Sequence, residues 1–413
     1  MNIFTIITLL IVISALFSYI NVRFLKLPTT IGLMIMAMIF TVGISTSSLF
    51  TDAILSNAVI IISSINFKEV LLDVMLSFLL FAGALHTNFT QLKAQRYPIM
   101  MFATFGVLLS TFLIGTVAFY LLNYMQLPIS YLQALLFGAL ISPTDPIAVL
   151  GILKQAGVPK KLETKIVGES LFNDGIGVVI FLTLFQLAAS PNADISFSHI
   201  GFLFVEEVGG GILLGLALGY VTYLMLKSIN NYETEVMLTL AMVMGGYLLA
   251  SQLHFSGPLA MVVAGLFLGN DSRRESSMSE VTERYVDKFW ELLDVLINAI
   301  LFVLIGLEVL ILSFDGNYIL AGFILIPVAL ICRYTALLGP IQIFKKKLDF
   351  VPRTGLIMTW GGLRGGISIA LALSLTDEMN RELIVAITYI IVVFSIIVQG
   401  LTVKQVVNWL KVK

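Results

Sequence analysis

The stretch at residues 135–153, LLFGALISPTDPIAVLGIL, is apolar at both ends and is interrupted in the middle by Pro143 and Pro146. Each proline removes a backbone hydrogen-bond donor and clashes with the preceding turn of a helix. In lipid, the carbonyl groups freed in this way need polar partners, so such a break belongs beside a polar cavity. Thr144 and Asp145 lie between the two prolines. We expect Asp145 to compensate the positive N-terminal end of a half-helix.

The composition around this stretch is that of a membrane protein. Of 413 residues, 58% are hydrophobic and 12% are charged, and the mean hydropathy is +1.00. Soluble domains are about 25% charged. Apolar runs near 20 residues, long enough to cross ~30 Å of hydrocarbon, recur from end to end. This predicts an all-α polytopic protein formed by one transmembrane domain, residues 1–413, with no soluble domain.

Several partners and modifications are not expected from the composition. A net charge of −1 does not suggest a nucleic-acid partner. Cys332 is the only cysteine, so an intrachain disulfide is impossible and redox chemistry is not expected. No His or Cys lies at metal-ligand spacing from another, and we expect no cofactor. The first apolar run lacks a basic segment before it, so we interpret it as a retained helix.

Thirteen membrane segments are predicted. They lie near residues 3–20, 30–48, 69–87, 97–123, 130–152, 163–187, 200–227, 234–252, 257–270, 288–312, 318–343, 353–375 and 384–404. The stretch 53–65 is apolar but contains several Ser and Asn residues, and we interpret it as interfacial.

The distribution of basic residues tests this assignment. With the N-terminus outside, only Lys68 and Arg381 of the 24 Lys and Arg fall in outer loops, and Arg333 and Arg364 fall inside segments. The other 20 then share the cytoplasmic side, as the positive-inside rule requires. We therefore predict an outer N-terminus and a cytoplasmic C-terminus.

A second interrupted segment lies at residues 356–375, LIMTWGGLRGGISIALALSL, where four glycines surround Arg364. Glycine within a helix favours unwinding, and Arg364 can compensate negative helix C-termini. The two interrupted segments are the fifth and the twelfth, so they cross in opposite directions. Paired broken helices of this kind mark the site of a transporter with inverted repeats. We predict repeat one at about 1–190, a linker segment at about 198–228 and repeat two at about 233–413.

The sixth segment carries two acids in the motif GESLFNDG. A charge at the centre of a bilayer costs at least ~2.5 kcal/mol, which makes a functional role the first hypothesis. Ser170 and Asp174 are four residues apart and share a helix face. Glu169 and Asn173 share another, roughly 140° away. We expect Glu169 to pair with Arg333 as a structural charge pair.

Asp174 is expected to bind the transported ion. A carboxylate without a fixed positive partner in a partly dry cavity can exchange a proton near physiological pH. It is also a hard oxygen ligand for a small cation. We predict Na⁺ at Asp174, Ser170 and Thr144, with Asp145 and Asn173 beside them. The interpretation that all these charges form one neutralised structural network stays open, although two Arg facing three acids leave one acid over.

These motifs together resemble a known family. The quoted segments are SPTDP, GESLFNDG, SGPLAMVVAGLFLGN, FVLIGLE and GGLRGGISIALALS, in that order and over nearly the whole chain. They resemble the monovalent cation:proton antiporter-1 family, and within it the prokaryotic NhaP-type sodium/proton antiporters. The resemblance implies thirteen helices in two inverted six-helix repeats, a core domain moving against a dimerisation domain, and a homodimer.

The resemblance also assigns site residues. It implies that Asp174 of the Asn173–Asp174 pair binds the ion, and that Asn173, where some relatives carry a second Asp, makes the exchange electroneutral. The other matching residues are Thr144, Asp145, Glu169, Ser170, Arg333 and Arg364. Animal members carry a long regulatory tail that has no match here, so we expect a multi-pass protein of a prokaryotic plasma membrane.

The leading hypothesis is a secondary antiporter, not an enzyme, that exchanges Na⁺ or Li⁺ for H⁺ with a 1:1 stoichiometry. A K⁺/H⁺ antiporter of the same fold, a cation channel and an intramembrane aspartyl protease using Asp145 and Asp174 remain alternatives. Asp294 and Asn298 are four residues apart and are expected to line a cytoplasmic funnel. Glu206, Glu207 and Glu308 are interpreted as charges near the outer mouth.

Overall fold

The computed structural model describes residues 3–47, 52–63, 69–145, 153, 157–189, 197–312, 315–345 and 350–410. Every regular element within these ranges is helical. The α-helices are α1 (Ile3–Ile20), α2 (Thr29–Ser47), α3 (Asp52–Ser63), α4 (Leu76–Leu85), α5 (Phe89–Ala94), α6 (Arg96–Met101), α7 (Val107–Tyr124), α8 (Tyr131–Ile141), α10 (Lys160–Ala189), α11 (Phe197–Ser228), α12 (Tyr232–Gln252), α13 (Gly257–Leu268), α14 (Asp271–Ser277), α15 (Glu280–Glu308), α16 (Gly316–Phe344), α17 (Thr354–Trp360), α18 (Gly366–Leu373), α19 (Arg381–Phe394) and α20 (Gly400–Trp409).

Four π-helical turns adjoin these helices. They are η1 (Asn21–Leu25), η2 (Glu69–Met75), η3 (Phe102–Gly106) and η5 (Ser395–Gln399). A short 3₁₀ turn, η4 (Asp377–Met379), precedes α19.

Nine helical stretches within the described ranges are long and apolar enough to cross a membrane. They are formed by α1 with η1, α2, α6 through α7, α10, α11, α12, α15, α16, and α19 through α20. Each falls on one of the predicted segments. The remaining four predicted segments contain the shorter helices α4, α8, α13 and the pair α17 and α18. The all-helical membrane fold is therefore confirmed, while thirteen crossings remain a proposal.

The stretch predicted to be interfacial contains α3. Its 12 residues extend about 18 Å at 1.5 Å per residue, which is well short of ~30 Å of hydrocarbon. Helix α3 is therefore too short to cross by itself. The rest of the stretch, from residue 64, lies outside the described residues.

Polar caps determine where several helices begin. The side chain of Ser130 accepts from the backbone of Gln133, whose own side chain accepts from Ser130, so a capping box starts α8. Ser256 caps α13 and is followed by a proline in the first turn. Such side chains satisfy N–H groups that have no partner within the helix.

Small residues allow α7 and α8 to pack backbone to backbone. A Cβ added at Gly115 would lie 2.9 Å from the carbonyl oxygen of Ala134, and one at Gly138 would lie 2.2 Å from that of Thr111. Larger side chains would force the two helices apart, as is common at helix interfaces in membranes. Helix α8, which leads into the first break, is thereby held against α7.

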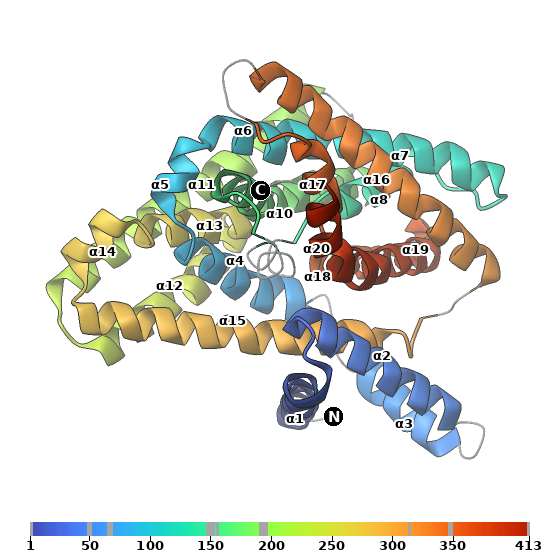
Figure 1. Cartoon of the computed structure of the whole chain (residues 1–413), viewed down its shortest axis with the longest axis horizontal. Helices are drawn as coiled ribbons and strands as arrows, with labels where there is room; N and C mark the ends of the chain where they lie inside the picture. Colours follow the sequence, from blue (N-terminus) through green and yellow to red (C-terminus); the bar gives the residue numbers. More distant parts are fainter. Residues whose placement is uncertain are drawn as a thin grey trace.

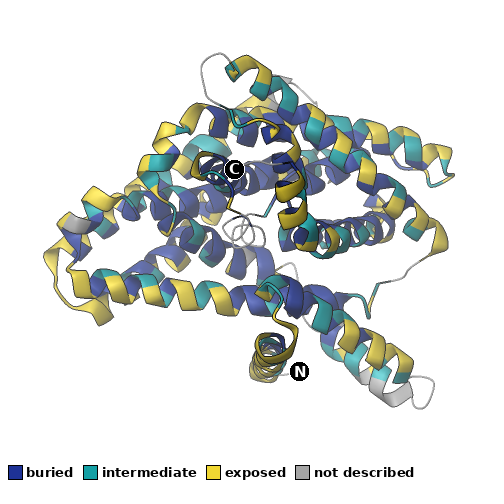
Figure 2. Ribbon diagram, in the orientation of Figure 1, coloured by how far each residue is buried: buried dark blue, intermediate teal, exposed yellow. Residues whose placement is uncertain are grey.

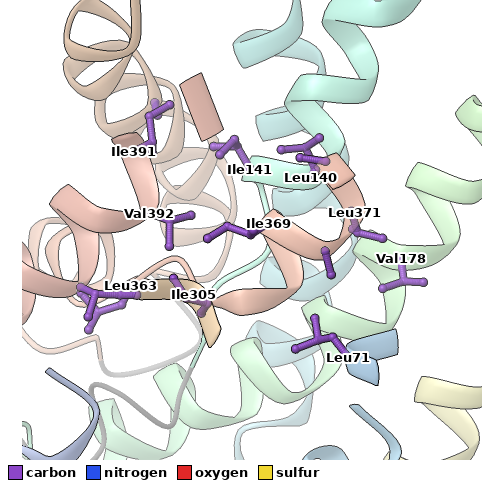
Figure 3. Close-up of a cluster of buried hydrophobic side chains, with 14 of the residues drawn as sticks. Leu71, Leu140, Ile141, Val178, Ile305, Leu363, Ile369, Leu371, Ile391 and Val392 are labelled. Atoms are coloured by element: carbon purple, nitrogen blue, oxygen red, sulfur yellow. The ribbon is translucent and has the colours of Figure 1, made fainter. Parts of the chain in front are cut away.

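The two interrupted segments lie at the centre of the molecule (Figure 1). Figure 3 shows apolar side chains around them: Leu140 and Ile141 from α8, Ile369 and Leu371 from α18, and Val392 from α19. All are buried. This apolar cluster surrounds the polar backbone of the breaks.

The outer faces of the helices carry many exposed residues (Figure 2), and large apolar side chains are among them. Leu213 of α11 and Leu248 of α12 are examples, as is Leu292 of α15. Such faces suit contact with lipid hydrocarbon. Helix α1 packs mainly against α2, η1 and α15 among the described elements and is largely exposed (Figures 1 and 2).

Candidate ion-binding site

The two interrupted segments meet through their backbones. Helix α8 ends at Ile141, and the chain continues as coil through Asp145; residues 146–152, including Pro146, lie outside the described residues. Helix α17 ends at Trp360, and α18 begins at Gly366. The backbone N–H of Asp145 donates to the carbonyl oxygen of Leu363 at 2.8 Å. The two breaks therefore lie side by side.

Arg364 lies at the end of α8. Its Nη1 donates to the carbonyl oxygens of Ser142 at 2.5 Å and Pro143 at 2.9 Å. Its backbone N–H donates to Ser395 Oγ at 2.9 Å. The last carbonyls of a helix lack intrahelical partners and carry partial negative charge. The buried Arg364 guanidinium satisfies the two carbonyls that directly follow α8. This is the kind of helix end that Arg364 was expected to compensate.

Asp145 lies beside the start of α18. A Cβ added at Gly365 would be 2.6 Å from Asp145 Oδ2, so only glycine lets the carboxylate approach this closely. The next residue, Gly366, opens α18. A carboxylate near the first turn of a helix is stabilised by the partial positive charge there.

Glu169 and Arg333 form an ion pair inside the protein. Arg333 Nη2 lies 3.1 Å from Glu169 Oε1, and the two side chains are only 4% and 2% exposed, respectively. Arg333 also donates through Nε and Nη2 to the carbonyl oxygen of Met358, at 3.3 and 3.2 Å. One guanidinium thus links α10, α16 and α17.

Thr144, Ser170 and Asn173 form a neutral network. The hydroxyls of Thr144 and Ser170 are 3.0 Å apart. Asn173 Nδ2 donates to Thr144 Oγ1 at 2.9 Å, and Asn173 Oδ1 accepts from the backbone N–H of Thr144 at 3.3 Å. All three residues are buried. The network fixes the first break against α10.

Asp174 opens onto a cavity of about 50 Å³. Its side chain is buried, with the residue 5% exposed, and the carboxylate forms no hydrogen bond or ion pair with any residue that the structure describes. Asp145 lines the same cavity, as do the polar residues Asn298 and Ser368. We call this the Asp174 cavity. A buried carboxylate without a paired cation can accept either a proton or a metal ion.

Two larger pockets approach this cavity. The α15 pocket, about 710 Å³, is lined by charged residues of α15 down to Asp294 and Val295. The α11–α13 pocket, about 440 Å³, includes Glu206 and Glu207 and shares Leu76 with the wall of the Asp174 cavity. The Asp174 cavity therefore has two larger pockets near it, each with acidic residues in its lining.

The predicted site residues occupy two places. Asp174 and Asp145 line the cavity, whereas Ser170, Thr144 and Asn173 bond to one another behind it. Glu169, Arg333 and Arg364 hold the surrounding helices together. Within the described ranges, no cluster of three or more His, Cys, Asp or Glu could hold a resident metal ion.

Two polar residues of the cavity were not predicted as such from the sequence: Ser368 and Asn298. Ser368 lies in the first turn of α18, and its position just after the glycine break is the only sequence signal that points to it. Asn298 was expected in a funnel with Asp294. Asp294 lines the α15 pocket, and Asn298, one turn further along, lines the Asp174 cavity. Glu308, interpreted as a mouth charge, is buried and lines a separate pocket with Arg381.

Comparison with known proteins agrees with this architecture. The chain is 47% identical over 407 residues to the Na(+)/H(+) antiporter NhaP of Pseudomonas aeruginosa, covering 96% of this chain and 95% of that one. It is 34% identical over 394 residues to the Na(+)/H(+) antiporter NhaH of Halobacillus dabanensis, covering 94% and 93%. The sodium proton antiporter MjNhaP1 of Methanocaldococcus jannaschii has the same fold, with a TM-score of 0.77 at 21% identity over 99% of both chains.

Residues 11–409 match the family described as sodium/hydrogen exchanger, transmembrane. The match covers almost the whole chain, including both breaks, the Glu169–Arg333 pair and the Asp174 cavity. The resemblance drawn from the sequence motifs is confirmed by this match and by the similarity to NhaP. This protein belongs to the transmembrane sodium/hydrogen exchanger family.

Proposed function

We propose that this protein exchanges Na⁺ for H⁺ across a cell membrane and that Asp174 binds the two ions in turn. Membership of the sodium/hydrogen exchanger family supports the exchange. The observation that carries the role of Asp174 is its buried carboxylate on the cavity wall, with no ion-pair partner in the described chain.

The proposed stoichiometry is 1:1. Asp174 is neutral when it holds a proton, and its charge is compensated when it holds Na⁺. Asn173, the adjacent residue, is an uncharged amide bonded to Thr144, so it adds no second charge. The empty, ionised site is costly to move through a low-dielectric barrier. Only the two loaded forms cross, and the exchange is electroneutral.

The proposed cation ligands are Asp174, Ser170 and Thr144, with Asp145 beside them. Ser170 precedes Asp174 by one helical turn on the same face, and its hydroxyl contacts that of Thr144. Carboxylate and hydroxyl oxygens are the hard ligands that small cations prefer. Na⁺ is the substrate of this site and is not a resident cofactor.

The proposed transport cycle alternates access between the α15 pocket and the α11–α13 pocket. Both approach the Asp174 cavity, one through Asp294 and Asn298 and the other through Leu76. The interrupted segments, joined by Asp145 and Leu363, would move as one body with α10.

We further propose the topology and assembly that the sequence indicates. The chain crosses the membrane thirteen times as two inverted repeats, about 1–190 and 233–413, joined by the segment near 198–228. The N-terminus is outside and the C-terminus is in the cytoplasm of a prokaryote, because 20 of the 24 Lys and Arg then fall inside. The protein is a homodimer whose core domain moves against a dimerisation domain, as the family resemblance implies.

Transport into proteoliposomes tests the function. The vesicles contain a pH-sensitive dye and carry an imposed proton gradient, and addition of Na⁺ should dequench the dye. Li⁺ and K⁺ are then added in turn to compare the cations. Dequenching by K⁺ alone would support the K⁺/H⁺ alternative. Asp174→Asn should abolish the Na⁺-dependent dequenching, because an amide side chain neither takes up a proton in the physiological pH range nor provides an anionic ligand.

Two results would contradict the proposal. The first is an Asp174→Asn protein that still exchanges Na⁺ for H⁺. The second is an initial rate that follows a membrane potential imposed with valinomycin, as net charge movement or a cation channel requires. Elution of Asp174→Asn as a monodisperse peak in detergent is the control for folding.

A further inference from the structure

The side-chain amide of Asn298 uses its nitrogen, Nδ2, for hydrogen bonds, whereas its oxygen, Oδ1, has no partner among the described residues. Its Nδ2 donates to the backbone carbonyl oxygen of Asp294 at 2.9 Å and to Asp294 Oδ1 at 3.0 Å. Both partners are oxygen acceptors, so the amide nitrogen must face them. Asn298 Oδ1 is buried and has no hydrogen-bond partner among the residues that the structure describes.

A buried carbonyl oxygen without a donor is destabilising. Such atoms are rare in native proteins, and each calls for an explanation. At this position the amide could have been replaced by leucine, which has nearly the same shape, without leaving an acceptor unpaired. The unpaired Oδ1 therefore points to a partner that binds transiently.

The position of Asn298 indicates what that partner is. The residue is 4% exposed and lines the cavity that also holds Asp174 and Asp145. Because Nδ2 is turned back along α15, Oδ1 is the polar atom that Asn298 can present to the cavity. A neutral oxygen facing a cavity with two carboxylates suits a cation.

Asp294 connects this oxygen to the α15 pocket. Asp294 lines that pocket, and its carboxylate holds the Asn298 amide one helical turn deeper. A cation leaving the α15 pocket would meet Asp294 first and then Asn298 Oδ1. The two residues thus form a path of oxygen ligands along one face of α15.

We propose that Asn298 Oδ1 is a ligand of the transported cation, which it receives on the way between the α15 pocket and Asp174, and that Asp294 is a positioning residue for the Asn298 amide. This inference rests on the proposed exchange at Asp174. An amide oxygen is a hard ligand for a small cation, and because it is neutral it leaves the 1:1 stoichiometry unchanged.

The test separates cation affinity from turnover. Asn298→Leu keeps the side-chain volume and removes the oxygen. In proteoliposomes at alkaline pH, where proton competition is weakest, its KM for Na⁺ should rise about tenfold while the maximal rate stays within twofold of wild type. Asp294→Ala, which removes one of the two acceptors that hold Nδ2, should raise KM by a smaller factor, about threefold.

The matched control is Asn408→Leu. It makes the same chemical change at an exposed position of α20, away from the cavity, and should leave both parameters unchanged. If Asn298→Leu does not yield monodisperse protein, Asn298→Ala replaces it, because it removes the same oxygen and leaves a smaller side chain. The same rise in KM for Na⁺ is then expected.

The outcomes distinguish this inference from the proposed function. If wild type exchanges Na⁺ for H⁺, Asp174→Asn is inactive and Asn298→Leu keeps its KM, the ligand role is wrong and the function stands. A lower maximal rate with an unchanged KM has the same meaning, since it indicates a structural role. If wild type shows no cation-dependent pH change, the proposed function fails and this inference fails with it.

Discussion

The backbone N–H of Asp145 donates a hydrogen bond to the carbonyl oxygen of Leu363 at 2.8 Å. The bond joins two interrupted helices from opposite halves of the chain. Arg364, the next residue, adds two hydrogen bonds to the carbonyls that directly follow α8. The backbone of one break therefore satisfies polar groups of the other, so neither break would be stable in hydrocarbon alone.

The close approach at Gly365 should make this position intolerant of a side chain. In Gly365→Ala the new Cβ would lie 2.6 Å from Asp145 Oδ2, so the carboxylate must move away from the start of α18. We expect loss of most Na⁺/H⁺ exchange and a decrease in stability of about 1–3 kcal/mol, typical of overpacking. Dye dequenching and thermal unfolding in detergent measure the two effects.

Gly245→Ala is the control for that substitution. Gly245 lies in α12, and a Cβ there meets no atom within 4 Å. Alanine is the better helix former, so stability should be equal or slightly higher and exchange unchanged. Wild-type activity in Gly365→Ala would show that Asp145 need not keep its position.

The buried pair of Glu169 and Arg333 predicts a non-additive stability change. Glu169→Gln and Arg333→Gln each leave an uncompensated buried charge, and each should cost roughly 3–5 kcal/mol. Arg333→Gln should be the more severe, because it also removes the two hydrogen bonds to Met358. Melting temperatures of the purified proteins report both losses.

The double variant Glu169→Gln/Arg333→Gln completes the cycle. Neither residual charge remains, so it should recover part of the stability lost by Arg333→Gln. Additive losses within ~0.5 kcal/mol would instead indicate that the two charges do not interact.

The proposed orientation predicts a pattern of thiol labelling. In a Cys332→Ala background, a cysteine substituted for Ser272 in α14 should resist an impermeant thiol reagent added to intact cells and react after permeabilisation. Ser272 is exposed, so burial would not explain protection. A cysteine substituted for Asp377, whose side chain is 94% exposed, should react from outside. The reverse pattern would invert the topology.

Competition at one carboxylate predicts how apparent Na⁺ affinity depends on pH. A proton and Na⁺ exclude one another at Asp174, so KM for Na⁺ should rise about tenfold per unit of acidification once the site is mostly protonated, equivalent to ~1.4 kcal/mol per pH unit. The maximal rate at saturating Na⁺ should change far less. KM values from dequenching at a series of pH values measure this. A KM independent of pH over three units would mean separate sites for the two ions.

Much of this arrangement could be predicted from the sequence because membrane helices obey strong constraints. Pro143 and the glycines around Arg364 each disrupt a helix, so both breaks were expected where the structure has them. The angular separation of Glu169 from Asp174 along one helix also predicted that the two acids face different partners. In the structure, Glu169 pairs with Arg333, whereas Asp174 lines a cavity.

What could not be predicted depends on contacts between distant segments. No sequence pattern shows that Asn298 reaches the cavity while Asp294, one turn earlier, does not, because that depends on how α15 crosses the breaks. Ser170 and Thr144 were assigned to the cation from their spacing and type. Their mutual hydrogen bond depends on how α10 packs against the first break, which the spacing of the residues does not show.

The small volume around Asp174 bears on which ions this protein can discriminate. A cavity of about 50 Å³ holds only a few water molecules, fewer than a fully hydrated ion carries. An ion must therefore shed part of its hydration shell to enter. Dehydration costs grow steeply with charge, so entry costs Mg²⁺ and Ca²⁺ more than it costs Na⁺. The tightness of the cavity thus works against divalent ions before any ligand is reached.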